Sequence, residues 1–133
     1  MARSLTSHGE KQASRIANWL DRQLPEMARI LVSPARRAEQ TALALGRSYH
    51  CREELAPGCS ADQLLELVHW SGAKGTVLVV GHQPTLGQVI AKLVGFSSTQ
   101  CAVKKGAVWW LRHRQDQALP QAEIVTVQSP EFL

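Results

Sequence analysis

Two side chains that could bind an anion, Arg37 and His82, each follow a short apolar run of the sequence. Arg37 comes five residues after Ile30-Leu31-Val32, and His82 comes two residues after Thr76-Val77-Leu78-Val79-Val80. A guanidinium stays charged at every physiological pH and can bind two phosphate oxygens at once. An imidazole can donate a hydrogen bond or transfer a proton near pH 7. The two residue types together therefore predict a phosphate pocket.

The elements around these residues predict that both lie at one edge of a parallel sheet. Runs 30–32 and 76–80 have the length and β-branched content of buried strands. A helical pattern follows each run, the first ending at Gly46 and the second at Gly95. In open α/β sheets, ligands bind beyond the carboxyl ends of the strands, where helix N-termini also favour anions. We therefore expect Arg37 and His82 to be close together.

The rest of the chain completes an α/β prediction. The further elements that we expect are a helix over 7–24 with a capping box at Ser7 and Glu10, a helix with a capping box at Ser60 and Gln63, and β-segments 106–111 and 123–127. The two β-segments predict an antiparallel hairpin on a sheet edge. Strands that alternate with helices predict a three-layer sandwich with a mostly parallel sheet, in one domain over residues 1–133.

Composition excludes several classes of protein. The chain has 133 residues, of which 44% are apolar and 20% charged, as expected for one compact domain. Its net charge of +4 is scattered, and the sequence therefore predicts neither a nucleic-acid partner nor a membrane surface. A nucleic-acid-binding domain, suggested by the pI of 9.3 and by Arg112-His113-Arg114, is the weakest of the alternatives. No apolar stretch approaches the ~18 residues of a membrane span or forms a secretory signal, so the expected location is cytoplasmic.

The cysteines predict no metal site and no disulfide framework. Cys51, Cys59 and Cys101 are odd in number and lack the paired spacing of zinc ligands, so we expect reduced thiols. A metal site formed by His50, Cys51 and Cys59 is the alternative, although no other ligand type clusters there.

Three motifs, in this order, resemble the histidine phosphatase superfamily and its SixA-like branch of small phosphohistidine phosphatases. They are Leu5-Thr6-x-x-Gly9-x-x-Gln12-Ala13, Val32-Ser33-Pro34-x-x-Arg37-Ala38-x-Gln40-Thr41-Ala42 and Val79-Val80-Gly81-His82-Gln83-Pro84. The resemblance implies a phosphoglycerate mutase-like fold and phosphate transfer through a phosphorylated histidine. It also implies a pocket of two histidines and two arginines with no metal or organic cofactor. Arg37 matches the family's phosphate-binding arginine, and His82 matches its second pocket histidine.

The other arginine and the nucleophilic histidine are expected in an Arg-His-Gly or Arg-His-Ala motif at the end of a first strand before Leu5. The sequence contains no such strand or motif. We therefore expect a chain that lacks the nucleophile and is inactive as written. The natural protein is expected to begin roughly 15 to 25 residues upstream of Met1. Two internal histidines are less favoured as nucleophile: His8, which opens a helix, and His113, which follows an apolar strand whose end is expected at the opposite sheet edge.

The absent strand is central in the family, so its two neighbours are expected to present unpaired backbone groups to a gap. A monomer with this gap and a dimer paired through strand edges are both open. The first functional hypothesis is a phosphatase acting on phosphorylated histidine of a signalling protein or on a small phosphate compound. The alternative is a catalytically dead module that binds phosphate or a phosphoprotein through Arg37 and His82.

Overall fold

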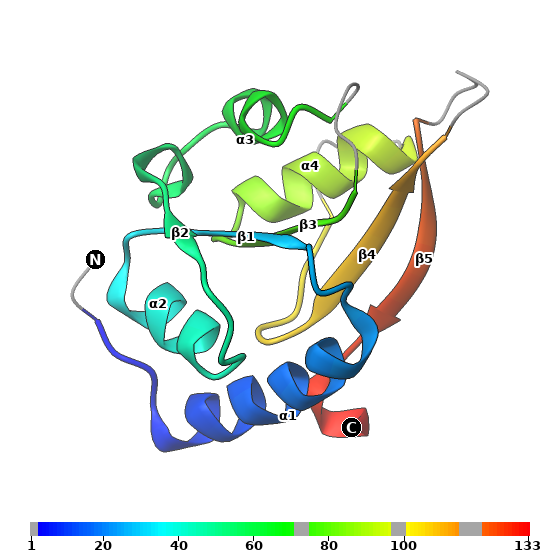
Figure 1. Cartoon of the computed structure of the whole chain (residues 1–133). Helices are drawn as coiled ribbons and strands as arrows, with labels where there is room; N and C mark the ends of the chain where they lie inside the picture. Colours follow the sequence, from blue (N-terminus) through cyan, green and yellow to red (C-terminus); the bar gives the residue numbers. More distant parts are fainter. Residues whose placement is uncertain (1–2, 71–74, 97–100, 115–120) are drawn as a thin grey trace.

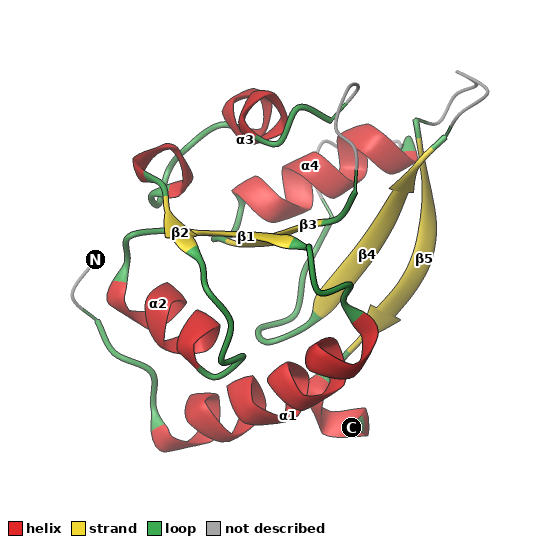
Figure 2. Cartoon of the chain, viewed as in Figure 1, coloured by secondary structure: helices red, strands yellow, loops and turns green. Residues whose placement is uncertain are grey.

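A computed structural model describes residues 3–70, 75–96, 101–114 and 121–133 (Figures 1 and 2). The elements are α1 (Ser7–Gln23), β1 (Arg29–Val32), α2 (Arg36–Leu43), β2 (His50–Cys51), the 3-10 helix η1 (Glu53–Leu55), α3 (Ala61–Leu67), β3 (Val77–Val80), α4 (Thr85–Val94), β4 (Val108–His113), β5 (Ala122–Gln128) and the 3-10 helix η2 (Pro130–Phe132). All predicted helices and strands are present. We predicted no strand at β2, because both of its residues are exposed and it is defined only by pairing with β1.

One of the two predicted helix caps is confirmed and the other is wrong. At α3, the Ser60 hydroxyl accepts the Gln63 N–H and the Gln63 side chain accepts the Ser60 N–H, which confirms the predicted capping box. At α1, the capping residue is Thr6, whose hydroxyl accepts the Gly9 N–H at 3.0 Å. The predicted cap at Ser7 is wrong because Ser7 is already helical, whereas Thr6 keeps the extended backbone of an N-cap residue.

The strands form two separate sheets. One is parallel, in the order β2-β1-β3, and the other is the antiparallel hairpin β4-β5, with a register shift between Trp110 and Leu111. We predicted that the hairpin extends the edge of one mostly parallel sheet. That prediction is wrong for the described residues, because no backbone hydrogen bond joins the hairpin to the three-stranded sheet.

Both sheets nevertheless contribute to the same two apolar cores. The core on the α1 and α2 side takes Ile30, Val32, Leu78, Val80, Val108 and Trp110 from the strands. The core on the α3 and α4 side takes Leu31, Val77, Val79, Leu111 and Ala122. Side chains alternate between the two faces of a strand, so β1, β3 and β4 all serve both cores. The hairpin therefore lies in the same layer as the parallel sheet, with helices on both sides (Figure 2).

β3 has an open edge. The Arg29 N–H donates to the Thr76 carbonyl and the Ser33 N–H donates to the Val80 carbonyl, both at 2.9 Å. Backbone groups alternate in direction along a strand, so the N–H groups of Val77 and Val79 point away from β1, and they have no hydrogen-bond partner among the described residues. All four β3 residues are apolar but only half-buried, whereas Val32 of β1 is 0% exposed.

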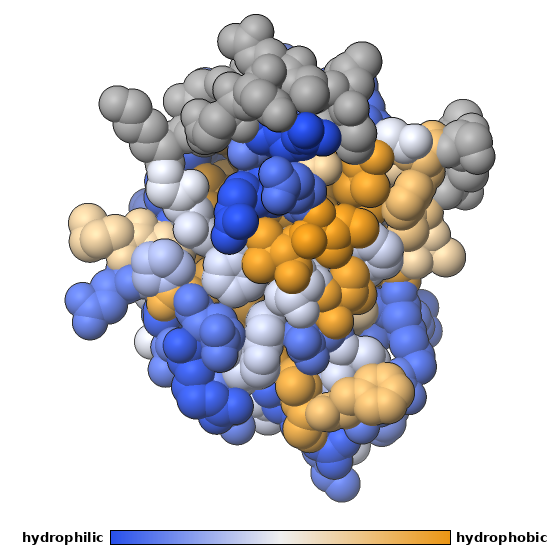
Figure 3. Space-filling view, turned by 90° about the vertical axis from the view of Figure 1, so that its right-hand side faces the viewer, coloured by the Kyte–Doolittle hydropathy of each residue, from blue (hydrophilic) through white to orange (hydrophobic). Residues whose placement is uncertain are grey.

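The outer strand of the hairpin also exposes apolar side chains. Figure 3 views the molecule from the side of the hairpin, where apolar residues gather. Ile124, Val125 and Val127 of β5 are 43%, 41% and 44% exposed. No helix in the described parts of the chain is long and apolar enough to cross a bilayer.

The open edge predicts an alternating pattern of amide exchange along β3. We expect slow hydrogen exchange at Leu78 and Val80, whose N–H groups face β1, and fast exchange at Val77 and Val79, whose N–H groups lack a partner. Residue-resolved exchange measured by NMR checks this. Equal protection of all four amides would mean that another strand pairs with β3 in solution.

Candidate functional site

The pairing of β1 with β3 brings the two predicted site loops together. The register places Val32 beside Val80, so Ser33 and Gly81-His82 leave the sheet at the same edge. The chain after Ser33 enters α2, which carries Arg37 in its first turn, and the chain after His82 enters α4. The expectation that Arg37 and His82 are neighbours is confirmed by a contact of 3.2 Å between Arg37 Nη2 and His82 Nδ1.

A third residue, Ser33, completes this cluster. His82 Nε2 lies 2.6 Å from Ser33 Oγ, and the Ala35 N–H donates to the same oxygen at 3.2 Å. His82 is 8% exposed and Ser33 is 0% exposed, so both groups are largely shielded from water. We call Ser33, Arg37 and His82 the edge cluster.

The contacts fix the protonation state of the His82 ring. A guanidinium can only donate hydrogen bonds, so Nδ1 must accept from Arg37 and carry no proton. Neutral imidazole then has its proton on Nε2, which donates to Ser33 Oγ. Burial and the neighbouring Arg37 charge both lower the pKa of His82 below its ordinary value of 6.5. The ring is therefore neutral at pH 7.

Arg37 has no carboxylate partner in the described parts of the chain. The ion pairs found there join other residues, namely Arg47 with Asp21, Arg52 with Glu54, Lys92 with Asp62, and Lys104 with Glu131. Arg37 is half-buried and its neighbour His82 is uncharged. A partly desolvated cation without a counter-ion favours an anion beside it.

The two helix N-termini at this edge differ. The N–H groups of Arg36 and Arg37 in the first turn of α2 make no hydrogen bond to a backbone carbonyl of the described residues, as is usual for that position. In α4, the Gly87 N–H donates to the Gln83 side-chain oxygen at 2.7 Å and the Leu86 N–H donates to the His82 carbonyl at 3.0 Å. The prediction that both helices offer N–H groups to an anion is therefore wrong for these α4 amides, because the loop before α4 caps its own helix.

The two alternative histidines lie on other elements than Arg37 and His82. His8 is exposed in the first turn of α1. His113 is the last residue of β4, whose tip points away from the carboxyl ends of β1 and β3 (Figure 1). The His113 ring packs against the Trp70 ring, with the two ring centroids 5.3 Å apart. The structure thus separates His113 from Arg37 and His82, and it places His8 on the exposed surface of α1.

The cysteines of the alternative metal site have different partners. Cys51 Sγ donates to a Glu39 carboxylate oxygen at 2.8 Å, a contact that, with burial and the Glu39 and Glu53 charges, raises the Cys51 pKa to about 11. Cys59 Sγ lies 3.7 Å from the Thr85 hydroxyl. Among the described residues, no three metal-ligating side chains come together. Nothing in this geometry favours the metal alternative.

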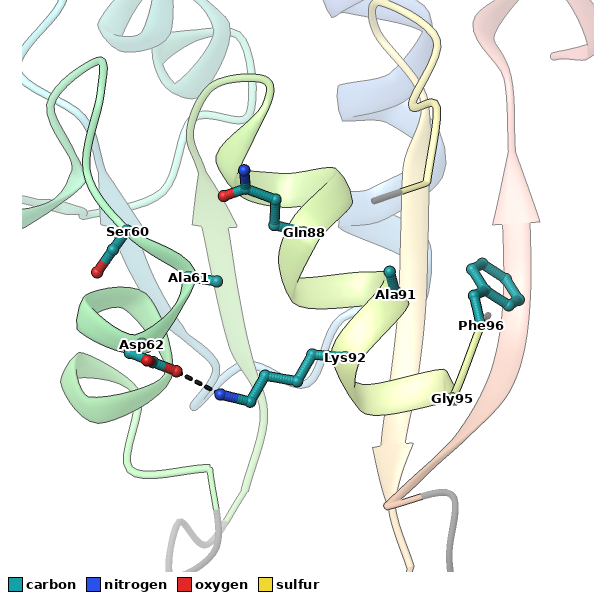
Figure 4. Close-up of a pocket in the computed structure, with 8 residues that line it drawn as sticks. All are labelled: Ser60, Ala61, Asp62, Gln88, Ala91, Lys92, Gly95 and Phe96. Atoms are coloured by element: carbon teal, nitrogen blue, oxygen red, sulfur yellow. Dashed lines mark hydrogen bonds and ion pairs between the residues drawn. The ribbon is translucent and has the colours of Figure 1, made fainter. Parts of the chain in front are cut away.

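A surface hollow between α3 and α4 is unrelated to the edge cluster (Figure 4). Ser60, Asp62, Gln88, Lys92 and Phe96 are among the residues that line it. The Lys92 ammonium and the Asp62 carboxylate form an ion pair across the hollow, so its two charges neutralise each other. None of the three edge-cluster residues reaches it.

Comparison with known proteins identifies the family of the chain. The sequence profile of the Histidine phosphatase superfamily (branch 1) matches residues 3–58. A Nakamurella multipartitia protein assigned as a phosphohistidine phosphatase SixA is 30% identical and has a TM-score of 0.79, with 97% of this chain and 86% of that chain covered. The chain belongs to the histidine phosphatase superfamily.

Two further matches also carry the SixA name. Phosphohistidine phosphatase SixA of Escherichia coli is 38% identical over 101 residues, which cover 68% of this chain and 62% of that protein. A SixA structure complexed with tungstate is 28% identical with a TM-score of 0.75, and the match covers 98% of this chain and 86% of that chain. The matched part spans less than two thirds of the E. coli protein and, at 66%, of the Haemophilus influenzae SixA homolog.

Sequence reasoning identified Arg37 and His82 but assigned no role to Ser33, although Ser33 belongs to the second superfamily motif. The signal that could have found Ser33 is its position. Ser33 directly follows β1 and His82 lies just after the paired strand β3, so the two residues are at the same sheet edge. A spacing pattern does not reveal which of the two ring nitrogens of His82 meets that hydroxyl.

The lowered pKa of His82 predicts that acid destabilises the folded chain. As pH falls through about 6.5, His82 of the unfolded chain binds a proton that the folded ring resists, so stability is lost between that pH and the lower folded pKa. We expect His82→Gln to lose less stability than the wild type between pH 7.5 and 5.5. Urea unfolding of both proteins checks this, and parallel pH profiles would contradict it.

Proposed function

We propose that the chain binds the phosphoryl group of phosphorylated histidine on a signalling protein, as the phosphate-binding part of a SixA-like phosphohistidine phosphatase. The observation that carries this proposal is the half-buried Arg37 guanidinium, which has no counter-ion among the described residues and lies against a neutral histidine. The membership in the histidine phosphatase superfamily and the likeness to SixA proteins support the choice of phosphate as the anion.

Each group of the site has a separate task in this proposal. Arg37 binds two phosphoryl oxygens through its planar fork. The unpaired N–H groups at the start of α2 donate to the same anion. His82 lies where it can donate to the negative charge that develops on the phosphoryl oxygens, once its Nδ1 carries a proton.

The phosphatase reaction needs a nucleophile in addition to these groups. In the proposed reaction, an unprotonated histidine nitrogen attacks phosphorus and the P–N bond of the substrate breaks, which releases the substrate imidazole. Water then attacks the phosphorylated histidine, and inorganic phosphate leaves. Arg37 and His82 stabilise charge in both steps, but neither is available as the nucleophile: Arg37 remains protonated, and His82 Nδ1 faces Arg37.

We propose further that the nucleophilic histidine comes from a strand outside this sequence. The sequence has no Arg-His-Gly or Arg-His-Ala motif. The open edge of β3 lies in the same layer as β4. A strand parallel to β3 at that edge would end beside His82. The alternative is a chain that binds phosphorylated histidine without hydrolysing it, which Arg37 and His82 alone would suffice to do.

The two adjacent arginines of α2 allow a matched test of anion binding. Arg37→Ala is expected to weaken the binding of inorganic phosphate about 10- to 100-fold, because it removes a charged hydrogen-bond donor. Arg36→Ala removes the same charge from an exposed position and is expected to change affinity less than about threefold. Titration of both variants by NMR or calorimetry checks this. Equal losses of phosphate affinity in the two variants would mean that only the net charge of the chain matters, and would reject the proposed pocket.

Turnover separates the phosphatase from the binding module. The chain as given is expected to bind phosphate without hydrolysing phosphoramidate. A version extended at its N-terminus by roughly 20 residues, with an apolar strand that ends in Arg-His-Gly, is expected to release phosphate. Release by the given chain that is abolished by His113→Ala would overturn the placement of the nucleophile. An extended chain that binds phosphate without turnover would favour the binding module.

A further inference from the structure

Ser33 occupies a fixed position at the end of β1. Its N–H donates to the Val80 carbonyl of β3 at 2.9 Å, so the sheet holds its backbone. Its side chain is 0% exposed, and its hydroxyl oxygen has two contacts, the Ala35 N–H at 3.2 Å and His82 Nε2 at 2.6 Å. A hydroxyl oxygen has two acceptor lone pairs, which these two contacts use.

We infer that Ser33 is the positioning residue of the edge cluster: by accepting the Nε2–H of His82, it turns Nδ1 of the same ring toward Arg37 and toward any anion that Arg37 binds. The part of this inference that concerns the anion rests on the proposed function. The part that concerns the orientation of the ring rests on the three side-chain contacts alone.

The opposite tautomer does not fit the same geometry. With the proton on Nδ1, the ring would present an N–H to the Arg37 Nη2 group, which is also a donor, at 3.2 Å. Two donors at that distance repel each other, and the buried site contains no described acceptor between them. Arg37 and Ser33 therefore act on opposite nitrogens of one ring and together allow only the Nε2–H form.

This arrangement has a chemical consequence at the anion position. When the ring gains a proton from solvent, the new N–H is on Nδ1, because Nε2 is already protonated and bonded to Ser33. In the free site this N–H would face the Arg37 Nη2 donor, so Nδ1 takes up a proton only when an anion lies beside Arg37 and accepts from both groups. Among the described residues, the charged group in contact with the His82 ring is Arg37 of α2.

Ser33 also accepts the Ala35 N–H, so a structural role in the loop before α2 must be separated from its action on His82. A double-mutant cycle makes this separation. We expect Ser33→Ala to weaken inorganic phosphate binding about tenfold, as the loss of a hydrogen bond that serves a charged site does. In a His82→Ala background, Ser33→Ala is expected to change affinity less than about twofold, because the ring that it positions is gone.

Two controls complete the affinity measurements. Ser60→Ala removes a serine hydroxyl that caps α3 and is expected to leave phosphate affinity unchanged. Ser33→Thr keeps the hydroxyl and is expected to bind phosphate within about threefold of the wild type. Equal effects of Ser33→Ala in the presence and absence of His82 would overturn the inference and assign Ser33 to the loop alone.

A spectroscopic measurement tests the orientation without any anion. In the wild type, the His82 Nε2–H should give a resolved proton NMR resonance that exchanges slowly with water, and Ser33→Ala should lose it. Retention of this resonance in Ser33→Ala would overturn the inference. A wild type that shows the resonance but binds no phosphate would reject the proposed function while it left the role of Ser33 in place.

Discussion

The parallel pairing of β1 with β3 is the constraint on which the rest of the structure depends. Parallel strands end at the same edge of a sheet, and the register that sets Val32 beside Val80 makes Ser33 and His82 neighbours. A shift of one residue would turn the buried side chains of β1 to the other core and move Ser33 away from the His82 ring. The hydrogen bond from the Ser33 N–H to the Val80 carbonyl is the last of this ladder, so the site begins where the sheet ends.

The positive charge of the site arises because no carboxylate of the described residues pairs with Arg37. Arg37 lies within hydrogen-bond distance of a neutral ring and has no carboxylate partner among the described residues. Burial and the neighbouring Arg37 guanidinium keep the His82 pKa low, so the ring is neutral and the guanidinium leaves the site with a net positive charge. Elsewhere in the described chain, arginines such as Arg47 and Arg52 lie beside carboxylates. This contrast distinguishes a residue that stabilises the fold from one that is available to a ligand.

The open edge of β3 connects the fold to the proposed function. Four apolar residues in a row are typical of a strand covered by neighbours on both sides and both faces, yet Val77–Val80 is only half-buried. The β4-β5 hairpin shares both apolar cores with β3, but among the described residues no backbone hydrogen bond joins the two. The two sheets thus share their apolar cores, while the open edge of β3 lacks a backbone partner among the described residues. The nucleophile that the proposed reaction needs would enter through this same edge.

The sequence by itself determined the local elements and the two main candidate residues. Periodicity located the helices, the glycines after α2 and α4 marked their ends, and strand-loop-helix patterns placed Arg37 and His82 at one edge, because these signals depend on residues near in sequence. Tertiary structure alone decided the rest. The two-residue strand β2, the separation of the hairpin from the sheet, the distance of His113 from the cluster and the hydrogen bond from His82 to Ser33 all depend on residues far apart in the chain. Side-chain contacts between such residues arise only when strand register and packing are set, which is why no spacing pattern revealed them.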